Sequence, residues 1–408
     1  MIRRTLFLGF ALLLLSCSTQ KGGGSATLSN SIVTNSKQNI AVAGDKEATR
    51  SDKGFWGDLL SDVCESSSME NVCISPLSAQ LAMAMVANGA EGETKKEICN
   101  TLQIGDDANS HSKRLLYVPA GQSCRFEIAN SIWINEKLDV KEEFIAANKE
   151  YFDALVERTK FDKNAVDRIN EWCKEKTNGR IPSIIEEVRP DDMMYLLNAI
   201  YFKAVWSQPF SEENTSKQKF TTEKGEEVEV DMMMQRNAAT YYSDDVLSIA
   251  EKSYNGGYRM LLVLPNEGVA CGEAAKYLAQ NFDACIGKMK RCDLQLSLPK
   301  FTTEFCTSLK PHLANLGINR AFSKKAQFGG ISDTPLLISD VMQKTFIAVD
   351  EKGTEAAAVT SVMVGLLSAR RPDNVEIMTL DRPFIYAIVK HDNEVMFVGK
   401  VGNPNKEN

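Results

Sequence analysis

Histidine is scarce in this chain of 408 residues, which carries only His111, His312 and His391. Histidine is the usual general base near neutral pH and a frequent metal ligand. All three lie in polar or surface-like stretches, so we expect them to be exposed and non-catalytic. The GxSxG, HExxH and P-loop lysine motifs are also absent. We therefore expect no enzymatic activity, metal or cofactor. A Ser–His–Asp arrangement stays open, because its members need not be neighbours in sequence.

Paired cysteine motifs are missing as well. None of the ten cysteines forms a CxxC pair or a zinc-like cluster with histidine. Nine remain if Cys17 is set aside, so at least one is unpaired within a monomer. Cys285 and Cys292 could pair, although nothing in the sequence requires it. Three others lie in apolar periodic segments and are expected in the core: Cys73, Cys99 and Cys173.

No basic stripe runs along the chain. The formal net charge is -7, and lysine and arginine are scattered among acidic residues. This balance argues against nucleic acid as a partner. Hydrophobic residues make up 43% of the chain, which is enough to build a large buried core.

A membrane-length hydrophobic run is absent too, because the N-terminal run Leu6–Leu15 is too short to span a bilayer as a helix. Two arginines precede it, so residues 1–16 are predicted to be an export signal. The ending Leu-Leu-Ser-Cys resembles a bacterial lipobox, which implies a lipid on Cys17 and attachment to the cell envelope, at the outer membrane or cell surface. The alternative is a plain signal peptide cleaved nearby.

The rest of the chain is predicted to be a tether followed by one folded domain. Residues 17–54 are polar and rich in glycine and serine, which indicates a flexible linker. Residues 55–408 show helical patterns early and alternating strand patterns late, without a βαβ rhythm, which is typical of an α+β fold. Ser75 followed by Pro76 predicts the start of a helix, because serine can cap the free amides and proline fits the first helical position. Segments 141–161 and 303–322 are also expected to be helical. The apolar stretch 193–210 is expected to be a central strand.

The stretch VMQKTFIAVDEKGTEAAAVT, residues 341–360, resembles the hinge of a serpin, a serine protease inhibitor fold. The similarity runs in order from Phe55 to Pro404 through NVCISPLSAQLAMAMVANGAEGETKKEI, LLNAIYFKAVWSQPF, LSLPKF, LGINRAF, DRPFIYAI and FVGKVGNP. It implies three β-sheets, eight or nine helices and an exposed reactive loop. It also implies a sheet-opening region made of Ser75, Ser78, Asn198, Lys203, Trp206 and Gln343.

The resemblance further implies a suicide-substrate inhibitor. A serine protease would attack the loop and form a covalent acyl-enzyme, and the cleaved loop would then insert into the main sheet and distort the enzyme. The implied hinge comprises Glu351, Gly353, Thr354, Glu355, Ala356, Ala357 and Ala358. Glycine would let the backbone pivot. On insertion, alternate residues from Thr354 onward would face the core, and all are uncharged, whereas the outward set begins with Glu355, which can then stay in water. A charge or proline on the inward set would stop insertion.

The scissile bond is predicted by counting 16 residues beyond Glu351, the spacing usual in the family, which places it at Leu367–Ser368. Leucine there suits chymotrypsin-like, elastase-like or subtilisin-like proteases. The loop is longer than in some relatives, so Arg370–Arg371 is a trypsin-like alternative.

Other interpretations remain open at this point. Many relatives have histidine where Gln343 stands, so control of sheet opening is expected to differ. No basic cluster resembles a heparin-binding helix. The alternatives to a serine protease inhibitor are a non-inhibitory binding protein and a cross-class inhibitor of cysteine proteases, because acyl-enzyme trapping does not require a serine nucleophile. The expected partners are a protease and, through Cys17, a lipid bilayer. We expect a monomer at risk of forming loop–sheet polymers.

Overall fold

The computed structural model describes residues 54–105, 107–116, 124–355 and 375–407. These residues contain nine α-helices, within the eight or nine expected. They are α1 (Phe55–Ser66), α2 (Pro76–Ala87), α3 (Gly92–Leu102), α4 (Ala108–Leu116), α5 (Glu142–Phe152), α6 (Lys163–Lys176), α7 (Cys271–Gln280), α8 (Phe282–Lys288) and α9 (Lys310–Asn315).

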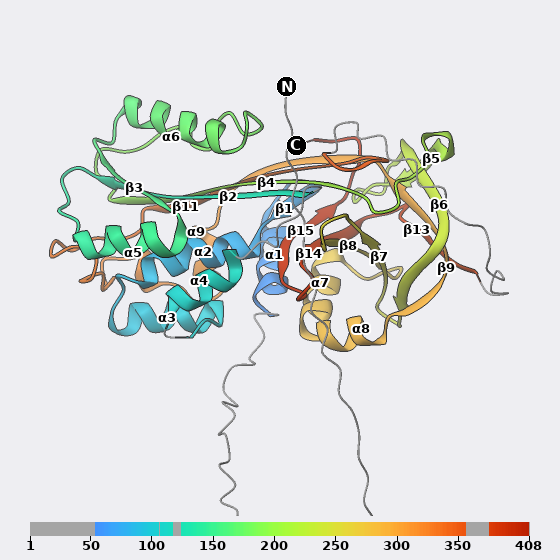
Figure 1. Ribbon diagram of the computed structural model, residues 1–408, viewed down its shortest axis with the longest axis horizontal. Coiled ribbons are helices and arrows are strands. Elements are labelled where there is room, and N and C mark those ends of the chain that lie inside the picture. The colour runs from blue at the N-terminus through green and yellow to red at the C-terminus, as the bar shows by residue number, and fades with distance from the viewer. Residues whose placement is uncertain (1–53, 106, 117–123, 356–374, 408) are drawn as a thin grey trace, which may run out of the picture. The chain divides into compact units, whose positions relative to one another are not determined.

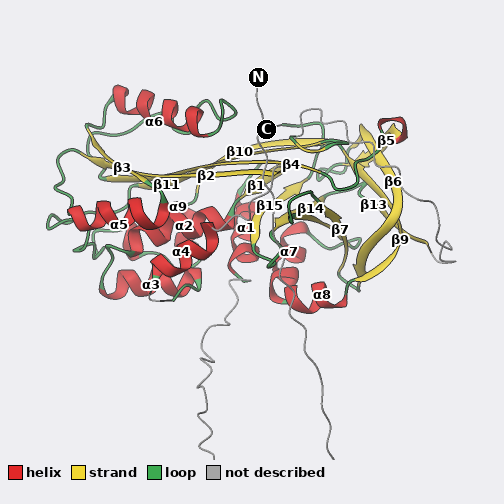
Figure 2. Cartoon of the chain, in the orientation of Figure 1, coloured by secondary structure: helices red, strands yellow, loops and turns green. Residues whose placement is uncertain are grey.

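A six-stranded sheet forms the centre of the fold. Its order is β10 (Phe301–Ser308), β11 (Asp340–Val349), β12 (Gly353–Thr354), β4 (Met194–Val205), β2 (Cys124–Asn135) and β3 (Leu155–Thr159). Helix α6 lies over one face of this sheet, and α2, α4 and α5 lie against the other (Figures 1 and 2).

A second hydrogen-bonded sheet has nine strands. Its order is β1 (Asn71–Ile74), β15 (Val395–Val401), β14 (Phe384–Val389), β8 (Arg259–Pro265), β7 (Leu247–Ser253), β6 (Glu227–Ser243), β9 (Lys290–Pro299) and β13 (Val375–Thr379), and β5 (Thr215–Thr221) pairs with β6. The resemblance implies three sheets, and the structure has two hydrogen-bonded ones, because the long strand β6 connects two groups of strands into this nine-stranded sheet. The first part of β6 pairs with β5 and β9, and its last residues pair with β7.

Strand β4 is buried on both faces, which explains the long apolar run seen in its sequence. Leu196, Ile200 and Phe202 belong to the main core. Leu197 and Ala199 point to the other face and belong to a second core beneath α6. A strand that is covered on both sides loses the polar alternation of a half-exposed strand.

Two expected helices are partly strands in the structure. In segment 141–161 the helix ends at Phe152, where Asp153 adopts a left-handed conformation with φ 48°, and Leu155–Thr159 then pairs with β2. In segment 303–322 the first residues belong to strand β10, which pairs with β11, and only Lys310–Asn315 is α-helical. Both errors arose because pairing with a distant strand overrode the local helical pattern.

Candidate functional site

The predicted hinge lies where strands β4 and β11 separate. The two strands pair directly and in parallel from Asp340–Tyr195 to Phe346–Tyr201. Beyond that point the short strand β12 lies between them. Thr354 is antiparallel to both, opposite Val349 of β11 and Ala204 of β4. The first residues of the hinge therefore already occupy a strand position inside the central sheet.

Gly353 permits this position because it has no side chain. A Cβ added there would lie 2.1 Å from the Ala204 carbonyl oxygen and 2.9 Å from Val205 Cα. The turn before it is held by Asp350, whose Oδ1 accepts hydrogen bonds from Lys352 N (2.8 Å) and Gly353 N (3.0 Å). The glycine at position 353 therefore lets the hinge backbone lie close to the backbone of β4, in addition to giving the conformational freedom expected of it.

Trp206 connects the end of β4 to the hinge turn. Its indole Nε1 donates to the Asp350 carbonyl oxygen at 3.0 Å, and its backbone N–H donates to the Lys352 carbonyl oxygen at 2.9 Å. Phe210 N–H donates to the Glu351 carbonyl oxygen at 2.9 Å. Three consecutive hinge carbonyls are thus held by one short segment, Trp206–Phe210.

Tyr254 supports both the tryptophan and the inserted threonine. Its ring stacks on Trp206 with 4.1 Å between centroids, and its hydroxyl lies 2.5 Å from Thr354 Oγ1. Burial raises the pKa of Tyr254 well above its ordinary value, so the group is a neutral phenol at physiological pH. The Thr354 side chain is fully buried, as expected of the inward set.

Glu351 anchors the start of the hinge. Its Oε1 lies 2.7 Å from Lys300 Nζ and accepts a hydrogen bond of 2.8 Å from Thr215 Oγ1. Burial by itself would raise the pKa of Glu351, but the hydrogen bonds from Lys300 and Thr215 outweigh it, and the pKa lies below its ordinary value. The carboxylate is therefore charged at neutral pH.

Glu355, the first residue of the outward set, is buried beside Arg180 in this structure, before any insertion of the loop. Only 8% of its side chain is exposed, and its carboxylate forms an ion pair with Arg180, in the segment after α6. Burial raises the pKa of Glu355. The residue has φ 49°, so the backbone turns here into a left-handed conformation instead of continuing as a strand. Lys203, on β4, is partly exposed nearby and lowers this pKa through its charge.

The middle of the β4–β11 seam carries the other sheet-opening residues. Gln343 faces Asn198 across the seam. Gln343 Oε1 accepts from Ser75 N at 2.8 Å, and its Nε2 donates to the Ser75 carbonyl oxygen at 3.0 Å. Asn198 Nδ2 donates to Asn130 Oδ1 at 2.6 Å. Ser75 Oγ caps helix α2 by accepting from Ser78 N, as the sequence predicts.

Two buried polar atoms of the predicted sheet-opening residues, one on β4 at the seam and one on α2, have no hydrogen-bond partner among the described residues. They are Asn198 Oδ1 and Ser78 Oγ. An unsatisfied buried acceptor costs roughly 1–3 kcal/mol. The closed seam is therefore a state in which at least one polar group lacks a partner that a further strand could supply.

Several predicted site residues lie outside the described residues. They are the lipidation residue Cys17, the hinge residues Ala356, Ala357 and Ala358, and the two candidate bonds Leu367–Ser368 and Arg370–Arg371. Their predicted roles stay predictions.

Sequence reasoning missed several residues that hold the hinge. Lys300, Thr215 and Tyr254 contact it from strands or turns that are 51, 136 and 100 positions away in sequence. Lys300 lies in the LSLPKF segment, but the segment assigns it no role, and a lone threonine or tyrosine in a strand pattern carries no positional signal. Only the packing of the second sheet against the end of the first brings them to the hinge.

One histidine expectation is corrected. His312 is 6% exposed, not a surface residue, and its Nδ1 lies 2.7 Å from Asp62 Oδ2. His391 is exposed, as expected. The aspartate comes from α1, so this pair connects two helices and does not lie at the hinge.

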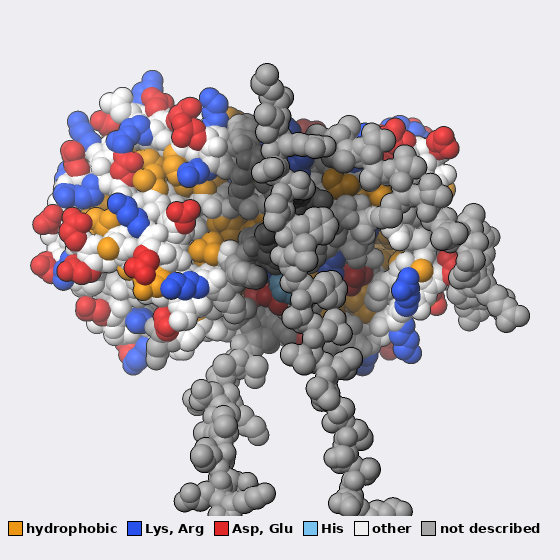
Figure 3. Space-filling view, viewed as in Figure 1, with side chains coloured by type: hydrophobic (Ala, Val, Ile, Leu, Met, Phe, Trp, Pro, Cys, Tyr) orange, Lys and Arg blue, Asp and Glu red, His pale blue; other side chains and the backbone are white. Residues whose placement is uncertain are grey.

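The described part of the chain holds no group of three or more acidic, histidine or cysteine side chains suited to a metal ion. Nor does it hold a helix long and apolar enough to cross a membrane. Cys285 and Cys292, which could have paired, are free thiols in this part of the chain, while Cys73, Cys99 and Cys173 are buried as expected. On the face shown in Figure 3, basic and acidic side chains are interspersed.

Comparison with known proteins identifies this arrangement. The family model described as "Serpin (serine protease inhibitor)" matches residues 50–404. The chain belongs to the serpin family. It is 31% identical to an uncharacterized serpin-like protein of Thermococcus kodakarensis, over 88% of this chain and 86% of that protein. It is also 31% identical to the plasma serine protease inhibitor of Bos taurus, over 86% and 90% of the two chains.

The structural comparison agrees. The native state of tengpin, a thermophilic serpin, matches with a TM-score of 0.78 and 34% identity, covering 86% of this chain and 94% of that one. This membership establishes the α+β serpin fold, and serpins are protease inhibitors rather than catalytic enzymes.

Proposed function

We infer that this serpin is a suicide-substrate inhibitor of serine proteases that traps its target by inserting the cleaved loop between β4 and β11. The observation that carries the proposal is the position of Gly353 and Thr354. They lie antiparallel to both neighbouring strands, at the end of a seam that is otherwise closed. A loop cut further along would be free to continue down that seam.

The register supports this path residue by residue. Thr354 faces Ala204 and Val349, and each further loop residue would meet one residue earlier on both strands. Thr360, six residues on, would arrive between Asn198 and Gln343. Its hydroxyl would offer a donor to Asn198 Oδ1, which lacks a partner in the closed seam. The uncharged composition of the inward set fits the fully buried core face of β4.

The free energy of insertion has an identifiable source. One parallel ladder between β4 and β11 would be replaced by two antiparallel ladders, and antiparallel pairing is slightly more stable per residue. The inserted strand would also bury apolar side chains on a face whose neighbours, Ile200 and Ile347, are fully buried. Both terms favour the inserted state once cleavage releases the loop.

The covalent step follows from acyl transfer. The protease serine would attack the Leu367 carbonyl carbon, the Leu367–Ser368 bond would break, and the Ser368 amine would leave with a proton. An ester would then join Leu367 to the enzyme. Insertion before hydrolysis of that ester would trap the complex. We keep Leu367 as the first candidate and Arg370 as the trypsin-like alternative.

We also propose that the mature protein is anchored by a lipid on Cys17. The support is the lipobox-like ending LLSC after a short hydrophobic run. Labelling the protein with a radioactive fatty acid in a bacterial host tests this. Label that persists in Cys17→Ala would contradict it, and loss of label with retained export would support it.

The first experiment mixes the mature protein with chymotrypsin, elastase, subtilisin and trypsin, followed by denaturing gels and mass spectrometry of the released peptide. A band at the summed mass and a peptide that begins at Ser368 would support trapping at Leu367. A peptide that begins at Arg371 would move the bond to Arg370. Complete cleavage without any stable complex would overturn the inhibitory proposal in favour of a non-inhibitory serpin.

A further inference from the structure

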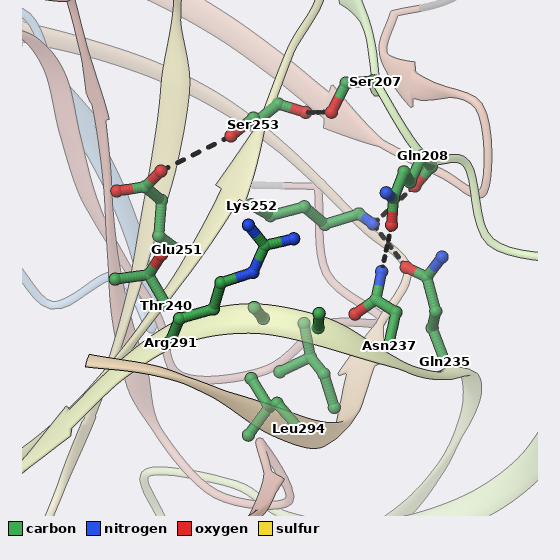
Figure 4. Close-up of a pocket in the computed structure, with 13 residues that line it drawn as sticks. Ser207, Gln208, Gln235, Asn237, Thr240, Glu251, Lys252, Ser253, Arg291 and Leu294 are labelled. Carbon is green, nitrogen blue, oxygen red and sulfur yellow. Dashed lines mark hydrogen bonds between the residues drawn. The ribbon is translucent and has the colours of Figure 1, made fainter. Parts of the chain in front are cut away.

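A small polar cavity lies next to the hinge, in a fork between strands. Strand β6 pairs with β7 only from Thr240 to Ser243, but with β9 from Met232 to Tyr241. Strand β7 therefore separates from β6, and the segment that follows β4 fills part of the gap. A cavity of about 160 Å³ remains there, lined among others by Ser207, Gln208 and Lys252 (Figure 4).

Lys252 crosses this fork as a buried ammonium group. The residue is 6% exposed, and its Nζ donates to the Gln208 carbonyl oxygen at 2.8 Å and to Gln235 Oε1 at 2.7 Å. The same nitrogen lies 4.0 Å from the centre of the Phe210 ring and 5.2 Å from that of Trp206. Three of these contacts are with the Trp206–Phe210 segment, and the fourth, with Gln235, is with strand β6.

No charged partner neutralises this lysine in the described part of the chain. Glu251, its neighbour on β7, pairs with Arg259. Arg291 of β9 also lines the cavity and adds positive charge, while the β6 side chains that line it are all neutral. On the hinge side, Glu351 is paired with Lys300, and Asp350 accepts backbone hydrogen bonds within its own turn. Burial without a counter-charge lowers the pKa of Lys252 to about 7.

The contacts of Lys252 lead directly to the hinge. Trp206 and Phe210, the two rings beneath its ammonium group, supply the donors that hold the carbonyls of Asp350, Glu351 and Lys352. We propose that Lys252 is a positioning residue for loop insertion: its buried amine clamps the Trp206–Phe210 segment and thereby keeps β12 in its place between β4 and β11. This inference rests on the proposed inhibitory function, because it describes how insertion is prepared.

The clamp depends on the protonation state of Lys252. Burial without a counter-charge disfavours the ammonium form, so protonation favours any opening of the clamp that returns the amine to water. Because the pKa is about 7, the clamp is firm above pH 7, where the neutral amine still donates hydrogen bonds, and weaker below it. A firmly held β12 starts insertion sooner after cleavage, so fewer acyl-enzymes are hydrolysed before they are trapped.

The test measures hydrogen exchange in the full-length protein without protease, at pH 6 and pH 8.5, with rates normalised to the unstructured chain. Peptides that report Trp206, Phe210 and residues 349–355 are compared in wild type, Lys252→Met and Lys252→Arg. In wild type we expect about three- to tenfold faster normalised exchange at pH 6 than at pH 8.5. Lys252→Met, which lacks both hydrogen bonds and the titration, should exchange fast at both pH values, and Lys252→Arg, which stays charged without a counter-charge, should also exchange fast at both.

A matched control and a functional readout complete the test. Lys276→Met removes a half-exposed lysine of α7 that pairs with Glu65, and it should leave hinge exchange unchanged. With a protease that wild type traps, Lys252→Met at pH 8.5 should give about two- to threefold more cleaved inhibitor per complex than wild type. Hinge exchange in Lys252→Met that equals wild type at both pH values would overturn the role of Lys252. Failure of wild type to trap any protease would overturn only the inhibitory proposal, since the exchange comparison needs no protease.

Discussion

Lys300 Nζ lies 2.7 Å from Glu351 Oε1 and connects the two sheets at the hinge. Lys300 stands between β9, the second-sheet strand that ends at Pro299, and β10, the central-sheet strand that begins at Phe301. Glu351 follows the end of β11 and is 5% exposed. The ion pair therefore fixes the start of the reactive loop to the junction of both sheets.

Removing this charge should loosen the hinge. We expect Glu351→Gln to lower the free energy of unfolding by about 1–2 kcal/mol, less than for a fully buried pair because Lys300 is partly exposed. Urea unfolding at pH 7 measures this, with the exposed Glu267→Gln as a control that should match wild type.

The effect of Glu351 should also depend on pH. Its pKa is below the ordinary value, so the stabilisation is present at neutral pH and is lost as the pH falls through the folded-state pKa. Wild type and Glu351→Gln should converge in stability at acid pH. If the difference in the free energy of unfolding between wild type and Glu351→Gln stays constant from pH 7 to pH 3, the ion pair is not the cause of that difference.

A side chain at position 353 should block the hinge. Gly353→Val would place Cβ 2.1 Å from the Ala204 carbonyl oxygen, so β12 could not keep its place and insertion would start late. We expect a loss of protease complex on denaturing gels, at least tenfold, with cleavage of the loop retained. Gly287→Ala in α8 is the matched control, because a Cβ there meets nothing within 4 Å. If Gly353→Val and wild type give equal yields of protease complex, the close contact of position 353 with β4 is not needed for insertion.

A charge at position 360 should stop insertion at the middle of the seam. The register would place Thr360 between the buried residues Asn198 and Gln343, where an unpaired carboxylate is strongly disfavoured. Thr360→Asp should therefore be cleaved without trapping the protease. Asn374→Asp adds the same charge beyond both candidate bonds and should trap normally. If Thr360→Asp forms complex as well as wild type, the proposed register is wrong.

Gln343 should contribute strongly to the stability of the closed sheet. Gln343→Met keeps the side-chain length but leaves Ser75 N and its carbonyl oxygen without their partners, which we expect to cost about 2–3 kcal/mol. Urea unfolding followed by circular dichroism measures the loss. Gln343→His should recover only part of it and should add a pH dependence that wild type lacks. Wild-type stability in Gln343→Met would mean that water replaces both bonds.

Lys252 should make stability rise with pH. Its pKa is about 7 in the folded protein and ordinary in the unfolded chain, so between pH 7 and about 10 the unfolded state binds more protons. The free energy of unfolding of wild type, relative to Lys252→Met, should therefore increase over this window. A difference that does not change with pH would indicate that Lys252 titrates normally.

Much of the fold could be predicted because its signals are local. Ser75 and Pro76 mark the start of α2 by capping chemistry, and the structure confirms both the cap and the helix. The uncharged inward set, every second residue from Thr354 to Leu366, could be read directly from the sequence. The errors came at β3 and β10, where a helical pattern was overridden by pairing with β2 and β11, strands that are distant in sequence.

The sequence by itself determined the family, the hinge composition and an inward face free of charge, because motif order and side-chain period need no knowledge of distant contacts. Only the tertiary structure decided that Thr354 already lies between β4 and β11, that Glu355 is held by Arg180, and that a buried lysine supports the hinge. Strand register, burial and pKa depend on which distant residues meet, and that is set by how the two sheets pack.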